Sequence, residues 1–253
     1  MKKRSLIAAI AMLVVSAIVL TSATFAWFSM GNSVDVTSFD AAVSKSDGLM
    51  ISADSTNWDT TITLDQISNA GAYTHIVGSS QKMFPVSSNG TSTFYTGHKE
   101  GDVVVIETID SQETGLYYEF PVWLKYKGEG SATVNLTGTT IDPKTANNAN
   151  DVAAKQAARL AVHADGASST TVYLPDTTGD GSLVYASATG RNPATTALTN
   201  TTTNLSNITV SLTSGTAVKV WVKLWIEGYD DQCTDELAAG GNLAVYLKFS
   251  KVA

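Results

Sequence analysis

The sequence is poor in cysteine and in charge, and each shortage excludes a class of protein. Cys233 is the only cysteine, so no disulfide can form within the chain. Only 15% of the residues are charged, whereas 43% are hydrophobic, which is too little charge for a coiled coil and too apolar for a disordered tail. Acidic residues outnumber basic ones by 23 to 16. Because the chain has no basic stripe, nucleic acid is excluded as a partner.

The common catalytic and cofactor-binding motifs are also missing. The histidines, His75, His98 and His163, are far apart, and none belongs to the His-Glu-x-x-His pattern of helical zinc proteases. The chain has no Gly-x-Ser-x-Gly elbow and no glycine-rich phosphate loop. We therefore expect no enzyme activity, no catalytic residue and no cofactor. A hydrolase whose residues meet only on folding stays open as an alternative.

The start of the chain carries the clearest pattern. Three basic residues at positions 2–4 precede Leu6–Leu20, a run without any charged residue, and small residues follow up to Ala26. This is the layout of a secretory signal peptide, with cleavage between Ala26 and Trp27 by a signal peptidase. The apolar run is short for a membrane span, but an uncleaved anchor over residues 1–26 is the alternative. The protein would then contact a membrane only through this segment.

The remaining residues, 27–253, are predicted to form a single domain outside the cell or at its surface. Cleavage would remove three basic groups and no acidic one, changing the formal net charge from −7 to −10. An acidic exported chain stays soluble and is repelled by anionic surfaces.

Alternation of apolar and polar residues dominates this domain, as in strands with one buried face. The strongest patterns cover Leu116–Lys127, Val218–Glu227 and Leu243–Phe249. Pro121 cannot donate a ladder hydrogen bond, so the first of these is an edge strand or is bulged there. Weaker strand patterns, separated by turn residues, cover Val34–Val43, Leu49–Ser52, Thr60–Leu64, Val103–Thr108, Ala132–Leu136, Leu160–Ala164, Thr170–Leu174 and Ile208–Leu212.

Only Asp151–Arg159 is typical of a helix, with Asp151 as its N-cap. Strands and helices do not alternate, which disfavours a parallel α/β sheet. We predict an all-β fold, an antiparallel β-sandwich of jelly-roll type with one short helix near residues 150–159 and a preceding signal helix. The Thr-, Asn- and Gly-rich stretch Asp176–Asn207 is predicted to be a long surface excursion.

The densest group of carboxylates follows the Val218–Glu227 strand. Calcium is bound by such oxygen ligands, although blocks of like charge are usually just solvated. The candidate calcium ligands are Glu227, Asp230, Asp231 and Asp235. Cys233 in the same loop is either a buried apolar residue or a free thiol.

Three tryptophans lie on the nominally polar faces of their strands, namely Trp123, Trp221 and Trp225. Either another part of the chain covers these faces, or the aromatic rings are exposed and contact a second subunit or a polysaccharide.

The segment Ser22-Ala23-Thr24-Phe25-Ala26-Trp27-Phe28 resembles the signal end of TasA/camelysin-type secreted proteins of Gram-positive bacteria, which use a dedicated signal peptidase of the SipW type. The stretch from Val34-Asp35-Val36 to Phe39-Asp40-Ala41 is similar to their first strand. Trp225–Cys233 resembles a recurrent ending of clostridial secreted proteins with this signal. The resemblance implies a jelly-roll protein of biofilm-matrix fibres, in which the first strand of one subunit fills a groove in the next. The camelysin name also implies a metal-dependent protease, for which this chain lacks the motif.

The residues give a separate argument for strand donation. Cleavage would free Trp27–Val43, which has no early hairpin partner, to join the sheet edge of a neighbour. A head-to-tail contact that does not close builds a filament. The apolar spacing changes phase between Val36 and Phe39, which requires a bulge or bend. The predicted donor residues are Val34, Val36, Phe39, Ala41 and Val43.

We therefore expect a secreted structural protein that forms extracellular fibres or biofilm matrix by head-to-tail strand donation, with itself as partner. The alternative is a cell-surface binding or adhesion module, with carbohydrate as one candidate ligand, held by the N-terminal apolar helix. A pilin is a further structural option, which an intact Leu6–Leu20 in the assembled protein would favour.

Overall fold

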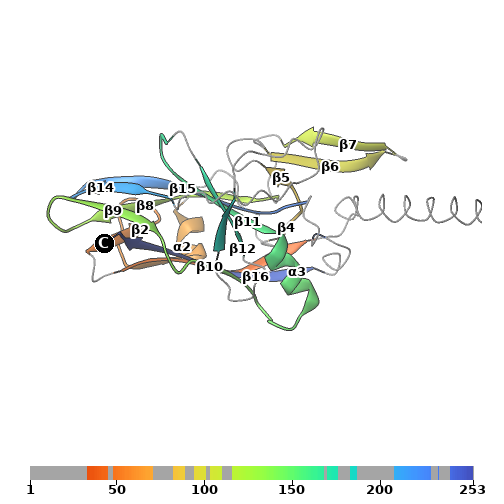
Figure 1. Cartoon of the computed structure of the whole chain (residues 1–253), viewed down its shortest axis with the longest axis horizontal. Helices are drawn as coiled ribbons and strands as arrows, with labels where there is room; N and C mark the ends of the chain where they lie inside the picture. Colours follow the sequence, from red (N-terminus) through yellow and green to blue (C-terminus); the bar gives the residue numbers. More distant parts are fainter. Residues whose placement is uncertain are drawn as a thin grey trace, which may run out of the picture.

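Figure 1 shows the computed structural model of the chain, which describes most residues between Ser33 and Val252. The described residues are 33–44, 48–70, 82–88, 94–100, 103–109, 116–167, 170–175, 183–186, 208–228, 233 and 240–252. The predicted signal peptide and its cleavage position at Ala26 and Trp27 lie outside them. In the described part of the chain, no helix has both the length and the hydropathy that a membrane span requires.

Two open sheets pack together around the main hydrophobic core, so the fold is sandwich-like. The first sheet has the order β14-β9-β16-β1-β3, with β10 paired to β16 and β4 to β1. Its strands are β1 (Val34–Val43), β3 (Thr61–Thr63), β4 (Lys82–Met83), β9 (Ser131–Leu136), β10 (Thr140–Pro143), β14 (Val210–Thr213) and β16 (Gly241–Lys251). The second sheet has the order β13-β12-β11-β15-β8-β2. Its strands are β2 (Leu49–Ser52), β8 (Tyr118–Tyr126), β11 (Ala158–Ala164), β12 (Thr171–Pro175), β13 (Leu183–Ala186) and β15 (Ala217–Ile226).

A third layer covers part of the outer face of the second sheet. Figure 1 shows its strands in yellow, β5 (Ser87–Ser88), β6 (Phe94–Glu100) and β7 (Val103–Thr108). Beneath it, Trp225 is fully buried and meets Phe94 edge-on, with the ring centroids 5.5 Å apart. Phe94 also stacks on Tyr117 at 3.7 Å. Because both faces of the second sheet are covered here, the C-terminal half of β15 is buried on both sides.

The strand positions predicted from alternation are confirmed. β1, β2 and β7 have the predicted bounds, and the three strongest patterns correspond to β8, β15 and β16. β8 lies between β15 and β2, but β2 ends opposite Trp123. Pro121 therefore occupies a local edge position, as its missing backbone N–H requires.

Two expectations about the elements are wrong. The first sheet is not purely antiparallel, because β1 runs parallel to β16. The helix α3 (Ala149–Ala157) is capped by Asn148 and not by Asp151, which lies in its first turn. The predicted surface excursion Asp176–Asn207 contributes β13 to the edge of the second sheet, and its other residues lie outside the described part of the chain. A second helix, α2 (Leu64–Asn69), was not expected.

Candidate functional site

The first strand lies inside the first sheet, between β16 and β3. Its parallel register with β16 runs from Val34 opposite Gly241 to Val43 opposite Phe249. The two strands that pair here are the first and the last in the described chain. The C-terminal strand therefore forms one wall of a slot, and the N-terminal strand fills it.

The five predicted donor residues form the buried face of β1. Each of them is at most 7% exposed, and they are Val34, Val36, Phe39, Ala41 and Val43. Phe39 meets Phe120 of the second sheet edge-on, with the centroids 5.0 Å apart. Full burial of one such Val or Phe side chain contributes about 1.5–3 kcal/mol. An empty slot would therefore expose a large part of the main core to water.

The predicted change of phase in this strand is confirmed. The register with β16 shifts between Val36 and Ser38. Thr37 lies at the irregularity, and its Oγ1 donates a hydrogen bond of 3.0 Å to the carbonyl of Leu243. The bulge brings Phe39 and Ala41 onto the core-facing side after Val34 and Val36, which explains the two phases of the sequence pattern.

The two sides of β1 differ in how firmly they hold the strand. β16 pairs with β1 from one end of β1 to the other. On the opposite side, β3 pairs only with Asp40–Ala42 and β4 only with Val34 and Asp35. The N–H of Val43 also donates to the carbonyl of Thr60, at 2.9 Å. The β3 side is the weaker one, and a leaving strand would separate there first.

The beginning of β16 is fixed by α3, which lies beside it in Figure 1. Asp151 is 2% exposed, and its carboxylate accepts from the backbone N–H of Asn242 at 2.8 Å and from that of Thr145 at 2.9 Å. Gly241 allows this close approach, since a Cβ there would lie 2.7 Å from the carbonyl oxygen of Asn150. The sequence pattern indicates only a helix cap for Asp151, because folding alone brings Asn242 to its carboxylate.

The prediction that Val34–Val43 is free for a neighbour is corrected by this arrangement, because β1 fills a slot in its own sheet. Hairpin patterns in a sequence indicate only partners that are close along the chain. The actual partner, β16, begins at Gly241, at the other end of the chain, and a parallel pair needs no tight turn.

The three tryptophans differ in exposure. Trp225 is 1% exposed, and its Nε1 donates to the Glu227 carboxylate at 3.1 Å, so for this residue the alternative of a covered face holds and the interface alternative is wrong. Trp123 and Trp221 are half-buried on the same face. Trp221 Nε1 donates to Asp165 at 2.9 Å, and the Lys219 Nζ lies 5.0 Å from the Trp221 ring centroid.

Of the four predicted calcium ligands, only Glu227 lies among the described residues. Glu227 is 4% exposed and engaged by Trp225, so it is not part of a solvated acidic turn. Asp230, Asp231 and Asp235 lie outside the described residues. The described residues contain no group of His, Cys, Asp and Glu side chains that could hold a metal ion. Cys233 is buried in the main core, as one of the two alternatives predicted.

A polar cluster lies on the outer face of the second sheet. The Lys223 Nζ lies 3.2 Å from the Glu119 carboxylate, and both side chains are largely buried. His163 is nearby, and its buried Nδ1 has no hydrogen-bond partner among the residues that the structure describes. Burial, and then the charge of Lys223, lower the pKa of His163, although Glu119 and Asp165 oppose this. The pairing of buried charges explains why a lysine and a glutamate are tolerated here.

Comparisons with protein-family models, with curated proteins and with solved structures found no match to this chain.

Proposed function

We propose that the chain is a secreted structural protein whose first strand is exchanged between copies. In this proposal β1 of one molecule fills the slot of the next, and the head-to-tail series forms an extracellular fibre or biofilm matrix. The observation that carries the proposal is a terminal strand whose apolar face fills a slot closed by the C-terminal strand. The resemblance to TasA/camelysin-type proteins supports the proposal. From that resemblance we also infer that the strands are connected as in a jelly roll.

Exchange conserves the contacts of the strand. The pairs with β16 and β3, and the burial of Phe39 against Phe120, form equally well between two molecules. Such swapping of an identical element is a low-cost route to assembly. If the signal is cleaved as proposed, β1 lies near the new N-terminus and can leave without threading through the fold. In the proposal, signal cleavage between Ala26 and Trp27 gives this end its freedom.

The connection between β1 and β2 is where an exchanged strand would turn. It joins Val43 in the first sheet to Leu49 in the second. Gly48, with φ of +71°, stands immediately before β2, and its lack of a Cβ permits this left-handed conformation. In the proposal β1 leaves its own first sheet at this connection, and β1 of the neighbouring molecule takes its place between β16 and β3.

Cysteine cross-linking tests the exchange directly. Asp40 and Thr63 are register partners on β1 and β3, within disulfide range for antiparallel neighbours. Both changes are made in a Cys233→Ala background to remove the native thiol. When the single variants Asp40→Cys and Thr63→Cys are mixed under assembly conditions and oxidised, we expect a disulfide-linked heterodimer and filaments in electron microscopy. The double variant, oxidised as a monomer, should not polymerise.

A pair away from β1 provides the control. Thr213 of β14 and Ser131 of β9 are also register partners, and both are exposed. Mixed single Ser131→Cys and Thr213→Cys variants should give no heterodimer of this kind. Filaments without the Asp40–Thr63 link would show that another contact builds the fibre, and monomers under all conditions would refute the proposal.

A cell-surface binding module is the second candidate, and one observation favours it. Trp123 and Trp221 stay half-exposed on the second sheet, whereas Trp225 is covered. Lys219 is the register partner of Trp123 and lies beside Trp221, so aromatic and cationic groups share one surface. If this surface binds a polysaccharide, Trp123→Ala and Trp221→Ala should lose sedimentation with the insoluble polymer while circular dichroism stays unchanged.

A further inference from the structure

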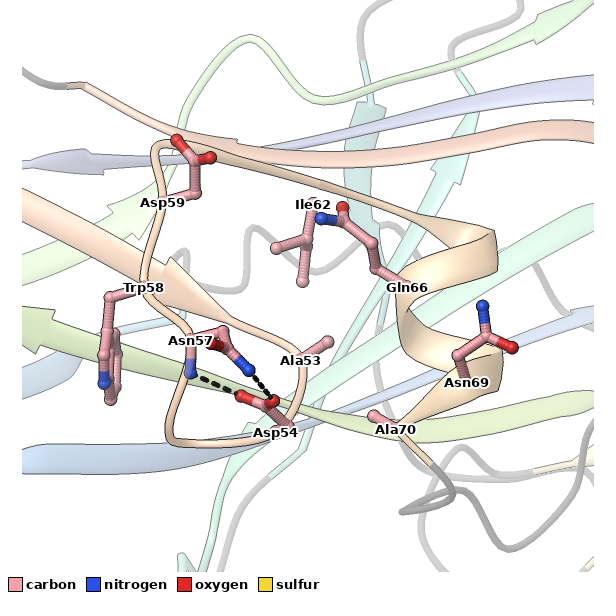
Figure 2. A pocket seen from close by; sticks show the side chains of 9 residues that line it. All are labelled: Ala53, Asp54, Asn57, Trp58, Asp59, Ile62, Gln66, Asn69 and Ala70. Atoms are coloured by element: carbon pink, nitrogen blue, oxygen red, sulfur yellow. Dashed lines mark hydrogen bonds between the residues drawn. The ribbon is translucent and has the colours of Figure 1, made fainter.

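A fourth tryptophan belongs to the outer face of the second sheet. Trp58 lies in the loop after β2, and Figure 2 shows its side chain on the far side of that loop from α2 and from the pocket that the loop and α2 line. The Nζ of Lys125 on β8 lies 3.9 Å from its ring centroid. Lys125 is on the outer face, because it is two residues from Trp123 along the same strand. Trp58, Trp123 and Trp221 therefore share this face, half-buried, whereas Trp225 is covered.

Both chain neighbours of Trp58 are fixed by hydrogen bonds. The Asp54 carboxylate accepts from the backbone N–H of Asn57 at 2.7 Å and from the side-chain amide of the same residue at 2.6 Å. On the other side, Asp59 pairs with Ile51 through two backbone hydrogen bonds of 2.8 and 2.9 Å. The loop therefore presents Trp58 in one position, and a ligand does not have to order it first.

Trp221 is held at the opposite end of the same face. Its Nε1 donates to the carboxylate of Asp165 at 2.9 Å, and the backbone N–H of Asp165 donates to the carbonyl of Lys219 at 2.9 Å. Asp165 is thereby fixed to β15, and in turn it orients the indole ring. Trp58 and Trp221 are both positioned before any ligand arrives.

The three rings follow a diagonal row across the sheet. Trp123 is the register partner of Lys219, and Trp221 lies two residues further along β15, which places the two tryptophans at diagonal positions about 7–8 Å apart. Lys125 continues the row by a step of about 7 Å along β8, and Trp58 lies against the end of its side chain. The row therefore extends over β15, β8 and the loop after β2.

The row carries positive charge in a chain that is acidic overall. The formal net charge of the chain is −7, yet Lys125 lies against the ring of Trp58, and the Nζ of Lys219 lies 5.0 Å from the ring centroid of Trp221. Asp165 balances Lys219, because its carboxylate is 3.6 Å from that Nζ. The charge of Lys125 is therefore the one that a ligand of opposite sign would complement.

These features distinguish between classes of ligand. The C–H faces of sugar rings pack against indole rings, and a linear chain of sugars can contact several rings of a row at once. A carboxylate on such a sugar would form a charge-assisted hydrogen bond with Lys125, which is roughly twice as strong as a neutral one. Nucleic acid depends on many phosphate contacts with lysine and arginine, and Lys125 and Lys219 alone do not supply them.

We propose that this row binds a linear acidic polysaccharide of the uronic-acid class, with Trp58, Trp123 and Trp221 as stacking residues and Lys125 as the partner of a sugar carboxylate. The proposal rests on the binding module that is the second candidate function, and it names the ligand and a third aromatic anchor. It does not depend on strand exchange, because these four residues belong to the second sheet and to the loop after β2.

A matched pair of polymers tests the ligand class on the whole chain. Polygalacturonate and its methyl ester differ only in the charge of their sugars. In affinity gel electrophoresis we expect polygalacturonate to retard the protein, and the ester to bind roughly tenfold more weakly. The retardation should decrease as salt is added. Alginate is a second acidic probe, and failure of both acidic polymers, or equal binding of the ester, overturns the proposal.

Variants locate the site. Trp58→Ala and Lys125→Gln should each weaken the binding of polygalacturonate roughly tenfold, whereas Trp58→Phe keeps a ring and should retain most of the affinity. The matched controls Tyr246→Ala and Lys144→Gln remove an exposed ring and an exposed cation elsewhere, and should leave binding unchanged. Melting curves followed by circular dichroism identify any variant that does not fold, and Lys125→Gln and Trp58→Phe keep the test decisive if Trp58→Ala is one of them.

The same measurements separate this proposal from the second candidate function. If Trp123→Ala and Trp221→Ala lose a polysaccharide that Trp58→Ala and Lys125→Gln still bind, the binding module stands and this proposal is wrong. Binding of a neutral polymer in preference to both acidic ones has the same meaning. Tighter binding of a single-stranded oligonucleotide that is lost in Trp58→Ala also overturns the proposal. If no polymer binds, the binding module and its proposed ligand both fail.

Discussion

Gly241 shows how one missing side chain positions a strand. A Cβ at this residue would lie 2.7 Å from both the Ala154 Cβ and the backbone oxygen of Asn150. The backbone atom can yield only if α3 moves. Asp151 would then lose its hydrogen bonds to Asn242, of 2.8 and 3.1 Å. The slot for β1 thus depends on a residue that makes no side-chain contact itself.

Gly241→Ala is expected to destabilise the protein by about 1–3 kcal/mol, the usual cost of overpacking. Urea unfolding followed by circular dichroism measures this free energy. As a control, Asn242→Ala removes one hydrogen bond to Asp151 but leaves the backbone bond, so it should cost about 1 kcal/mol. An unchanged midpoint for Gly241→Ala would mean that α3 does not pack against β16 as described.

His163 gives the protein a predicted dependence on pH. Its pKa is lowered in the folded state from the ordinary value of 6.5, by burial first and Lys223 second, with Glu119 and Asp165 opposing. Below pH 6.5 the unfolded chain therefore binds more protons at this residue than the folded one, and stability falls as pH falls. We expect the free energy of unfolding to decrease between pH 7 and pH 5, and His163→Gln to reduce that decrease. Equal slopes for the two proteins would contradict this assignment.

At the scale of elements, β3 and α2 together hold the weaker side of β1. β3 pairs with only Asp40–Ala42, and the capping box of Thr63 and Gln66 connects this short strand to the helix. The buried Ile62 lies opposite Ala41 in the register. Opening this unit would release one side of β1 without disturbing β16.

Loss of the cap should make that opening more frequent. Thr63→Ala removes the N-cap and is expected to cost about 0.5–2 kcal/mol locally. Amide hydrogens of Asp40–Ala42 should then exchange faster with solvent, while those of β15 keep their rates. Thr61→Ala is the matched control, because Thr61 is exposed on the same strand and makes no cap. If both variants exchange alike, the cap does not hold β1.

The sequence allowed prediction of the elements much better than of their pairing. Alternating apolar residues reveal a strand and its buried face. The bulge after Val36 is also visible in the sequence, as a change in the spacing of the apolar residues. Nothing in that pattern identifies β16 as the partner of β1, since hydrophobic faces are interchangeable. The Thr63-x-x-Gln66 capping box could have indicated α2, but the helix has only six residues. The pocket beside it was beyond prediction, because it depends on how Asp54 folds the loop.

At the scale of the whole molecule, the proposed fibre would assemble through the slot between β16 and β3 that β1 fills. Removal of Trp27–Val43 would expose the core around Phe120, Ile62 and Leu247, which lie against or beside β1. Four large side chains, those of Val34, Val36, Phe39 and Val43, are buried in the complete protein. At about 1.5–3 kcal/mol each, their loss approaches the roughly 5–15 kcal/mol that hold a typical domain together.

The shortened chain is therefore expected to be unstable alone but to refold around a synthetic peptide of residues 34–43. The peptide would restore the pairs with β16 and β3, as a neighbour's strand would in a fibre. Recovery of the cooperative melting transition, measured by circular dichroism against peptide concentration, tests this. A peptide with Phe39→Asp should fail, because a carboxylate would replace the ring against Phe120, whereas Asp40→Asn on the outward face should succeed. A shortened chain that is stable and indifferent to the peptide would mean that β1 is not required to fill the slot, and exchange would lose its driving force.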